Sequence, residues 1–185
     1  MPCQLFLGQT NERNSFMKII EALKHQKDLL RKASDLRTKI AKYSAHLNLE
    51  TPMYQDQTKQ VSEWLQSHND VLKEILKLRV AVQRTNLATQ VSIELDGQTV
   101  TKSITEWIHR RRDLATLEKE AWGMLSDKGL REGLVTDSQN EKREVKIIRC
   151  YNPAVRDKNI DILTSEPSII DSRLEVVNAV TDVIM

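Results

Sequence analysis

The chain has 185 residues, 39% hydrophobic and 4% aromatic, which is enough for one ordinary domain with a hydrophobic core but short for two. Its 28 Lys and Arg against 26 Asp and Glu argue against a nucleic-acid binder that depends on a large excess of positive charge. The five glycines are too scattered for a Walker A loop or a Rossmann fingerprint, and the long stretches without glycine or proline predict long helices.

The first sixteen residues differ from the rest of the chain, because helical spacing of apolar residues begins only after Phe16. Met17 is a natural beginning for that helix, and the codons of Glu12-Arg13-Asn14 can form a purine-rich ribosome-binding sequence just upstream. We therefore expect residues 1–16 to be a disordered arm or part of an over-called start. Residues 17–185 are predicted to form a single helical domain.

The first predicted helix begins at Met17 and carries apolar residues three and four positions apart as far as Leu47. A turn at 48–57 separates it from the strongest helical pattern in the chain. This second pattern alternates steps of three and four residues, as a coiled-coil seam does, over Val61, Trp64, His68, Val71, Ile75, Leu78, Val82 and Thr85. Three further leucines widen the apolar face: Leu65, Leu72 and Leu76. The width predicts a coiled-coil-like antiparallel hairpin that also packs on a further subunit or helix.

The pattern changes to alternation at residue 90, which predicts a small β-hairpin over about 90–101 with Asp96-Gly97 as its tight turn. Ser103 and Glu106 have the spacing of a capping box, so a helix is expected to begin directly after the hairpin.

The last third of the chain is predicted to contain shorter elements. The helix after the capping box is expected to close at 128–129, and the polar segment 129–143 is predicted to be a mobile loop. Residues 144–151 are predicted to be a strand. A short helix over 155–163 and a separate C-terminal helix beginning at 165–167 complete the prediction of a mainly α fold with a small β element.

Charge is distributed unevenly along the chain. Residues 18–42 hold eight basic and three acidic side chains, and residues 157–185 hold two basic and six acidic ones, so their net charges are +5 and −4. A basic front and an acidic back can attract each other, within one chain or between copies.

Two cysteines, Cys3 and Cys150, do not make a disulfide framework, which favours a reducing compartment. No apolar run approaches the roughly 20 residues that span a bilayer, and the first residues are too uncharged for a secretory signal. We therefore expect a cytoplasmic protein.

The sequence offers little for metal binding or covalent catalysis. The histidines have no cysteine or histidine partner at i+3 or i+4, so no metal site is expected: His25, His46, His68 and His109. His68 lies in the seam, where a lone polar residue more often fixes register. Cys150 is expected to be a buried strand residue rather than a nucleophile.

The densest cationic cluster is His109-Arg110-Arg111-Arg112, whose members point about 100° apart on an α-helix and cannot all face one ligand. Arg111 shares the apolar side of its helix and needs an anionic partner. One interpretation is an ion pair with the acidic C-terminal helix. The other is a pocket for an anionic, nucleotide-like ligand, lined by Arg84, Asn86, Arg111, Arg149, Tyr151 and Asn178.

Five segments stand out in order: MKIIEAL at 17–23, RTNLAT at 84–89, ITEWIHRRRDL at 104–114, EVKIIRCY at 144–151 and IDSRLEVVNAVTDVI at 170–184. Together they resemble a family of small bacterial and phage proteins sometimes labelled septicolysin, over nearly all of the chain after residue 16. The resemblance implies a mostly helical coiled-coil fold with a small β element and homo-oligomeric assembly. It implies no catalytic residues.

We therefore expect a non-enzymatic, homo-oligomeric binding or scaffold protein without a cofactor. In one form of this hypothesis it holds a small anionic ligand at subunit seams, as when a phage protein sequesters a host signal. The alternative is a structural or adaptor coiled coil of a phage particle or bacterial complex, with no small-molecule ligand. The expected partners are other copies of the chain and a small anion, rather than nucleic acid or a membrane.

Overall fold

The computed structural model describes residues 17–136, 138 and 140–185, so the expectation for residues 1–16 lies outside the described residues. The described residues divide into two compact units. One comprises the described residues up to Val82 together with Asn178–Met185, and the other comprises Gln83–Val177. Each has its own buried apolar cluster, because the hairpin seam of the first and the residues packed around Trp107 in the second bury separate surfaces.

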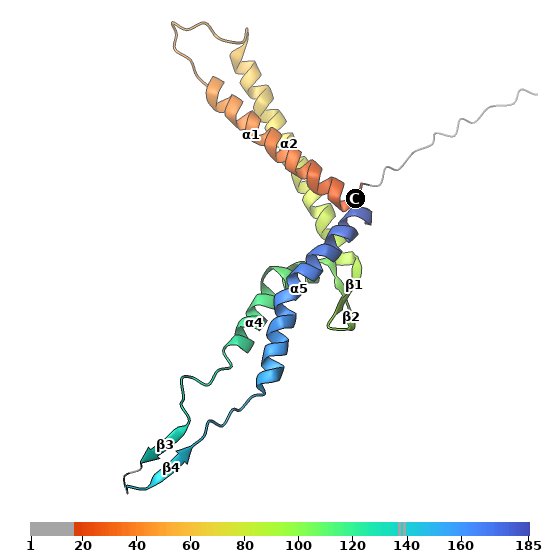
Figure 1. Ribbon diagram of the computed structural model, residues 1–185. Coiled ribbons are helices and arrows are strands. Elements are labelled where there is room, and N and C mark those ends of the chain that lie inside the picture. The colour runs from red at the N-terminus through yellow and green to blue at the C-terminus, as the bar shows by residue number, and fades with distance from the viewer. Residues whose placement is uncertain (1–16, 137, 139) are drawn as a thin grey trace, which may run out of the picture. The chain divides into compact units, whose positions relative to one another are not determined.

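The first unit is built on the helical hairpin of α1 (Ile19–Tyr43) and α2 (Gln57–Ala88), which lie side by side in Figure 1. Two contacts show that the helices are antiparallel: His25 Nε2 lies 3.0 Å from Glu74 Oε1, and the Tyr43 and Trp64 ring centroids are 5.7 Å apart. The predicted seam is confirmed by the burial of Val71, Ile75, Leu78 and Val82. On α1 the buried residues are Ile19, Ala22, Leu29, Ala33 and Leu36.

The C-terminal residues of the chain hold the beginning of α1 in place. The Ile19 amide donates to the Thr181 carbonyl at 3.0 Å, and the Val183 amide donates to the Met17 carbonyl at 2.8 Å. Lys18 adds an ion pair with Asp182, with Nζ 2.7 Å from Oδ1. These backbone bonds close the open end of the helical hairpin.

The second unit begins with the predicted β-hairpin, formed by antiparallel β1 (Gln90–Leu95) and β2 (Gln98–Ser103). Asp96 and Gly97 make the turn with φ of 48° and 75°, the left-handed conformation that a two-residue hairpin turn requires. The predicted capping box is also present, since the Glu106 amide donates to Ser103 Oγ and the Ser103 amide donates to Glu106 Oε2.

A helical segment comes next, in three parts: α3 (Ile104–His109), the π-helical turn η1 (Arg110–Leu114) and α4 (Ala115–Gly123). Trp107 is fully buried, and its indole Nε1 donates to the Val91 carbonyl at 2.9 Å, which fixes α3 against β1. The segment ends at Gly123, before the predicted 128–129. Glycine is a poor helix former, and Asp127 uses its side chain in contacts outside the helix.

Beyond α4 the chain forms an arm, which we define as residues 128–148 and which ends in antiparallel β3 (Gly133–Thr136) and β4 (Lys142–Val145). Figure 1 shows this hairpin beyond two extended segments. The prediction of a loop at 129–143 and a strand at 144–151 is therefore corrected. Only 142–145 lie opposite β3, and a strand needs a hydrogen-bonded neighbour, so 146–151 are not a strand.

The chain ends in one long helix, α5 (Pro153–Val180), where the sequence predicts two. Pro167 lies inside it, although proline usually breaks a helix. Leu163 and Ile170 are buried on either side of Pro167, and Glu166 is held by Arg110 through two hydrogen bonds. These tertiary contacts keep the two halves in one helix.

The expected fold class, mainly α with a long antiparallel hairpin, a small β element and a C-terminal helix, is confirmed. Among the described residues, no helix combines the length and the apolar character that crossing a bilayer requires.

Candidate functional site

A cavity of about 330 Å³ lies at the base of the arm. It is lined by two segments, within residues 124–130 and 147–151, that include the two ends of the arm. Its apolar lining comes from Met124, Leu125, Leu130, Ile147 and Ile148, and polar side chains reach it from Asp127, Arg149 and Tyr151. Two of the predicted ligand-binding residues, Arg149 and Tyr151, therefore line one cavity.

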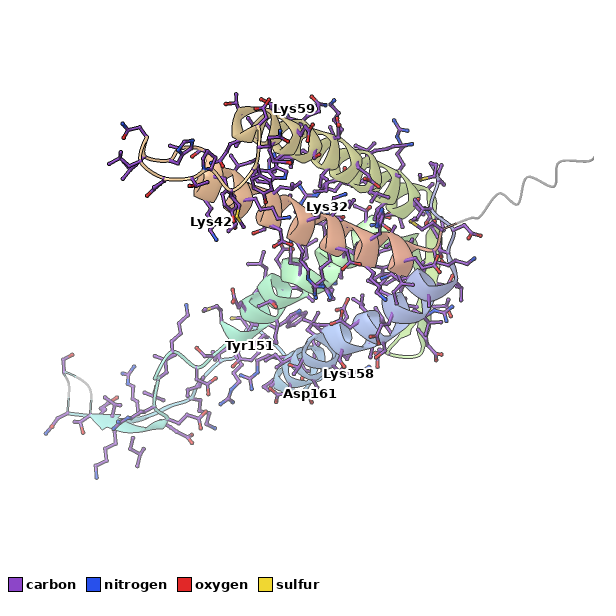
Figure 2. All side chains as sticks on the ribbon, turned by 90° about the horizontal axis from the view of Figure 1, so that it is seen from above. Lys32, Lys42, Lys59, Tyr151, Lys158 and Asp161 are labelled. Carbon is purple, nitrogen blue, oxygen red and sulfur yellow. The ribbon has the colours of Figure 1, made fainter. Side chains whose placement is uncertain are left out.

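These polar side chains form what we call the Asp127 cluster: Asp127, Arg149, Tyr151 and Arg156. The Arg149 guanidinium donates from Nε at 2.8 Å and from Nη2 at 2.6 Å to the two Asp127 oxygens. The Tyr151 hydroxyl donates to Asp127 Oδ1 at 3.2 Å, and Arg156 Nη1 donates to that hydroxyl at 3.3 Å and to the Leu125 carbonyl at 2.9 Å. Tyr151, labelled in Figure 2, lies just before α5, so the cluster joins the two segments on either side of the arm.

Within the Asp127 cluster, Asp127 and Arg149 each stabilise the charged form of the other. The hydrogen bonds from Arg149 are the largest cause that lowers the pKa of Asp127 below the ordinary aspartate value, and the same bonds raise the pKa of Arg149. A carboxyl with a lowered folded-state pKa stabilises the fold above its unfolded pKa and loses that effect as pH falls through the folded pKa. The Asp127 carboxyl is therefore charged at neutral pH, and its contribution to stability is lost only when it becomes protonated in acid.

The chemistry of the cluster is that of anion recognition, with the anion supplied by the chain itself. A guanidinium that binds one carboxylate through two parallel hydrogen bonds can bind a phosphate in the same way. Here Asp127 occupies that position, so an external anion has to displace it. Cys150 is exposed, which corrects the expectation of a buried strand cysteine; its segment lies outside β4.

Arg111 does not line the cavity. Its contact confirms the first of the two interpretations given for it, an ion pair with the acidic C-terminal helix. Its Nη1 pairs with Asp171 on the acidic C-terminal helix α5. Arg110 makes a second and more buried connection to the same helix, because its Nε and Nη2 donate to the two Glu166 oxygens at 2.6 and 2.8 Å. Its Nη1 also donates to Glu118 at 2.5 Å. These hydrogen bonds, with those to Glu166 the largest cause, raise the pKa of Arg110.

The π-helical turn explains how two consecutive arginines reach one neighbour. On an α-helix residues i and i+1 point about 100° apart, which predicts different partners for Arg110 and Arg111. The π turn begins at Arg110 and has more residues per turn, so adjacent side chains diverge less. Arg110 and Arg111 therefore both pair with α5, at Glu166 and Asp171.

The remaining predicted ligand-binding residues do not join the cavity. Arg84 is exposed on α2, and Asn86 is half-buried two residues further along. The buried Asn86 Oδ1 has no hydrogen-bond partner among the described residues. Asn178 is half-buried near the end of α5 and belongs to the first unit. Of the six predicted residues, the structure thus brings together Arg149 and Tyr151.

Sequence reasoning missed Asp127 and Arg156, which complete the cluster. Asp127 lies 22 residues before Arg149, and only the folding back of the arm brings the two together. The only sequence signal for such a contact is a pair of opposite charges on the two sides of a hairpin, and this signal is weak. No group of three or more histidine, cysteine, aspartate or glutamate side chains within the described ranges is placed to hold a metal ion.

A second candidate surface lies on the helical hairpin of the first unit. On α2 the exposed fractions of the three leucines that widen the apolar pattern are 48% for Leu65, 45% for Leu72 and 63% for Leu76. On α1, Leu23 and Leu30 are 44% and 42% exposed. We call these five residues the leucine face.

Helical geometry places all five leucines on one side of the hairpin. On each helix the exposed leucines lie about 100° around the helix axis from the buried residues. The direction of this rotation, viewed along the chain, is the same on both helices. Because α1 and α2 are antiparallel, the same sense on both helices leads to the same side of the pair. His25 and Glu74, which meet at 3.0 Å, lie on the opposite side by the same reasoning. The five leucines of the leucine face therefore lie on the same side of the hairpin.

Comparisons of this chain with protein families, with curated proteins and with solved structures found no match.

Proposed function

We propose that this chain is a non-enzymatic, homo-oligomeric helical scaffold of the cytoplasm, in which the α1–α2 hairpin is the assembly module. The observation that carries the proposal is the leucine face: five leucines on one side of a two-helix hairpin, each more than 40% exposed. A two-helix hairpin buries one seam, and apolar surface of this extent is typical of an interaction site. The septicolysin-like resemblance, which implies homo-oligomers, points the same way.

A second copy is the occupant we propose for this face. Two hairpins that place their leucine faces together form a four-helix arrangement, in which each helix buries apolar residues against two neighbours. Such a contact uses the same patch on both copies, as closed two-fold assemblies do. It also accounts for the width of the apolar pattern on α2, which exceeds what the contact with α1 uses.

Replacing Leu72 and Leu76 with glutamate tests this function. The double variant is expected to elute as a single chain of 21.3 kDa under conditions where the wild type is larger, because charges buried at a close apolar contact lose their hydration. Size-exclusion chromatography with light scattering measures the mass. Leu49→Glu is the matched control, since Leu49 is 93% exposed in the loop between the helices. If both variants keep the wild-type mass, the leucine face is not the assembly surface.

A second candidate function, binding of a small anionic, nucleotide-like ligand, is favoured by the Asp127 cluster. Arg149 and Tyr151 both donate to one carboxylate at the edge of a cavity of about 330 Å³ that has apolar walls. Those groups suit a phosphate joined to a flat apolar moiety. In this form of the proposal the scaffold stores a ligand, as in sequestration of a signal. The structural or adaptor alternative needs no ligand.

Replacing Asp127 with asparagine distinguishes these forms. If Arg149 and Tyr151 bind an anion, the variant is expected to bind adenosine monophosphate at least about tenfold more tightly than the wild type, because the competing carboxylate charge is gone. Isothermal titration measures the affinity, with Asp157→Asn as the control for loss of one negative charge nearby. Equal affinities of Asp127→Asn and Asp157→Asn, or no binding by either, would favour the ligand-free scaffold.

A further inference from the structure

The arm ends in a small sheet, the β3–β4 hairpin, whose residues are all exposed. Figure 1 shows this hairpin beyond two extended segments, away from α4 and α5. Its exposed apolar side chains include Leu134 at 72%, Val135 at 54% and Val145 at 43%. A hairpin of two strands is marginally stable in water, and further strands or a packed helix normally stabilise one. The hairpin therefore has the surface of an incomplete sheet.

The outer edge of β4 is open to a further strand. β3 lies along one side of β4, and within the described part of the chain no strand lies along the other side. Alternate residues of β4 therefore direct backbone N–H and C=O groups at a free edge. The chain stays extended after Val145, so Lys146 continues this edge. A strand supplied by another chain can bond here, as in β-strand addition.

The charges along this edge distinguish between the ways in which two copies can pair. Residues that face each other in an antiparallel pair both direct their backbone groups at the other strand or both direct them away. Two copies of one edge can therefore pair only with one residue opposite its own copy. Three of the four residues of β4 would then face a like charge: Lys142, Arg143 and Glu144. Val145 is the fourth and faces no charge.

We propose that the arms of two copies pair along β4 about a two-fold axis at Val145, forming a four-stranded antiparallel sheet. In this register Glu144 of each copy lies opposite Lys146 of the other, which gives two cross-strand pairs of opposite charge. Glu144 and Lys146 share one face of the strand, since Lys146 Nζ lies 3.2 Å from Glu144 Oε2 within the chain. The four charges then alternate in sign around the axis, and the two copies of Val145 meet on the other face.

The remaining charges of the edge are compatible with this register. Lys142 and Arg143 lie opposite Ile148 and Ile147 of the second copy, so neither directly faces a like charge. The nearest like charge to Lys142 is Lys146 of the second copy, on the diagonal. Because that lysine has a carboxylate on either side, one from each copy, its charge is offset.

The edge of β3 is the alternative contact between two arms. Its sequence, GLVT, contains no charged residue, so no charge pair fixes a register there. The arm as a whole is nearly neutral, since residues 128–148 hold five basic and four acidic side chains. Two arms therefore repel each other little, and the alternating charges favour the edge of β4.

The proposed contact is small and does not use the leucine face. An edge of a few residues buries far less than the roughly 1,200–2,000 Å² of a stable interface. We therefore expect arm pairing to be too weak to hold copies together during chromatography, so a covalent trap is needed to detect it. The inference goes beyond the proposed function, because a copy with two separate two-fold contacts can join more than one partner, as an extended scaffold requires.

A cysteine at the axis traps this contact. The native Cys3 and Cys150 are first replaced by serine, because Cys150 is exposed. Val145→Cys is then expected to form at least about tenfold more disulfide-linked dimer than Leu134→Cys or Val135→Cys, because facing Cα atoms about 4.5–5.5 Å apart suit a disulfide. The two controls on β3 are more exposed than Val145, so random collision favours them. Non-reducing electrophoresis, after equilibration at a fixed ratio of reduced to oxidised glutathione, measures the dimer.

Charge reversal with mixing tests the register. Adding Glu144→Lys or Lys146→Glu to the Val145→Cys chain is expected to lower the dimer yield about tenfold, because all four charges at the axis then have one sign. A one-to-one mixture of the two reversed chains is expected to recover the yield as a dimer of unlike chains, which intact mass spectrometry identifies. Both chains lack their own pair of opposite charges, so the recovery can come only from contacts between copies. Arg131→Glu is the matched control for net charge and is expected to keep the yield.

Three outcomes would overturn arm pairing. The first is a yield from Val145→Cys no higher than from the cysteines on β3, and the second is a mixture that recovers nothing. The third is a yield lost when the trap is repeated with Leu72→Glu and Leu76→Glu, because the cross-link would then follow from assembly through the leucine face alone. A yield that persists in that chain supports arm pairing, whether or not the leucine face proves to be an assembly surface.

Discussion

Replacing Arg110 with methionine is expected to lower the free energy of unfolding by about 3–5 kcal/mol, because it leaves a buried carboxylate without its partner. The Glu166 side chain is 4% exposed, and both of its oxygens accept from Arg110, at 2.6 and 2.8 Å. No other ion pair of α5 is comparably buried among the described residues. Urea unfolding followed by circular dichroism, at one fixed protein concentration, measures the loss.

Two further variants distinguish the destabilisation caused by an unpaired buried charge from that caused by losing an arginine side chain. Arg111→Met removes an exposed pair, with side chains 39% and 56% exposed, and is expected to cost less than about 1 kcal/mol. Combining Arg110→Met with Glu166→Leu is expected to recover most of the stability, because an apolar pair of similar size needs no charge partner. Equal losses of unfolding free energy for Arg110→Met and Arg111→Met would contradict the claim that the buried Arg110–Glu166 pair anchors α5.

Replacing Trp107 with alanine is expected to cost about 3–5 kcal/mol, since it removes the largest fully buried side chain in the described part of the chain. Its indole also donates to the Val91 carbonyl at 2.9 Å, so the hairpin β1–β2 loses its connection to α3. Thermal unfolding measures the effect.

Trp107→Phe divides this loss into its two parts. The phenyl ring keeps most of the apolar volume but donates no hydrogen bond, and we expect a loss of about 1–3 kcal/mol. Trp122→Ala is the control, because Trp122 on α4 is only half-buried. A Trp107→Ala variant as stable as Trp122→Ala would mean that Trp107 does not hold the hairpin on the helix.

Elements specified by neighbouring residues were predictable. The seam of α2 follows from steps of three and four residues, and Leu78 and Val82 are buried as this spacing requires. The turn of the first β-hairpin follows from Asp96-Gly97, whose backbone adopts positive φ. The capping box at Ser103 is equally local, because its partner Glu106 is three residues away.

Elements that depend on distant partners were not predictable. Pro167 marks a helix start by local rules, yet α5 runs through it because Glu166 is anchored by Arg110, 56 residues earlier. The strand at 144–151 is shorter than its apolar pattern indicates, because β3 offers partners only for 142–145.

The candidate site also has parts that could be predicted from the sequence and parts that could not. The sequence identified Arg149 and Tyr151 as anion-binding types, and their convergence on one cavity fits that chemistry. No local pattern indicated that Asp127 already holds them, since that contact forms only when the arm folds back. The pairing of Arg111 with the acidic C-terminal helix was foreseeable from charge, whereas the π turn that also turns Arg110 toward α5 was not.

The central claim, self-association through the helical hairpin, is tested most directly by sedimentation equilibrium of the full chain over micromolar concentrations. The account predicts a weight-average mass above 21.3 kDa that approaches a multiple of this value at high concentration and falls toward the single-chain value on dilution. A mass of 21.3 kDa at every concentration would contradict it.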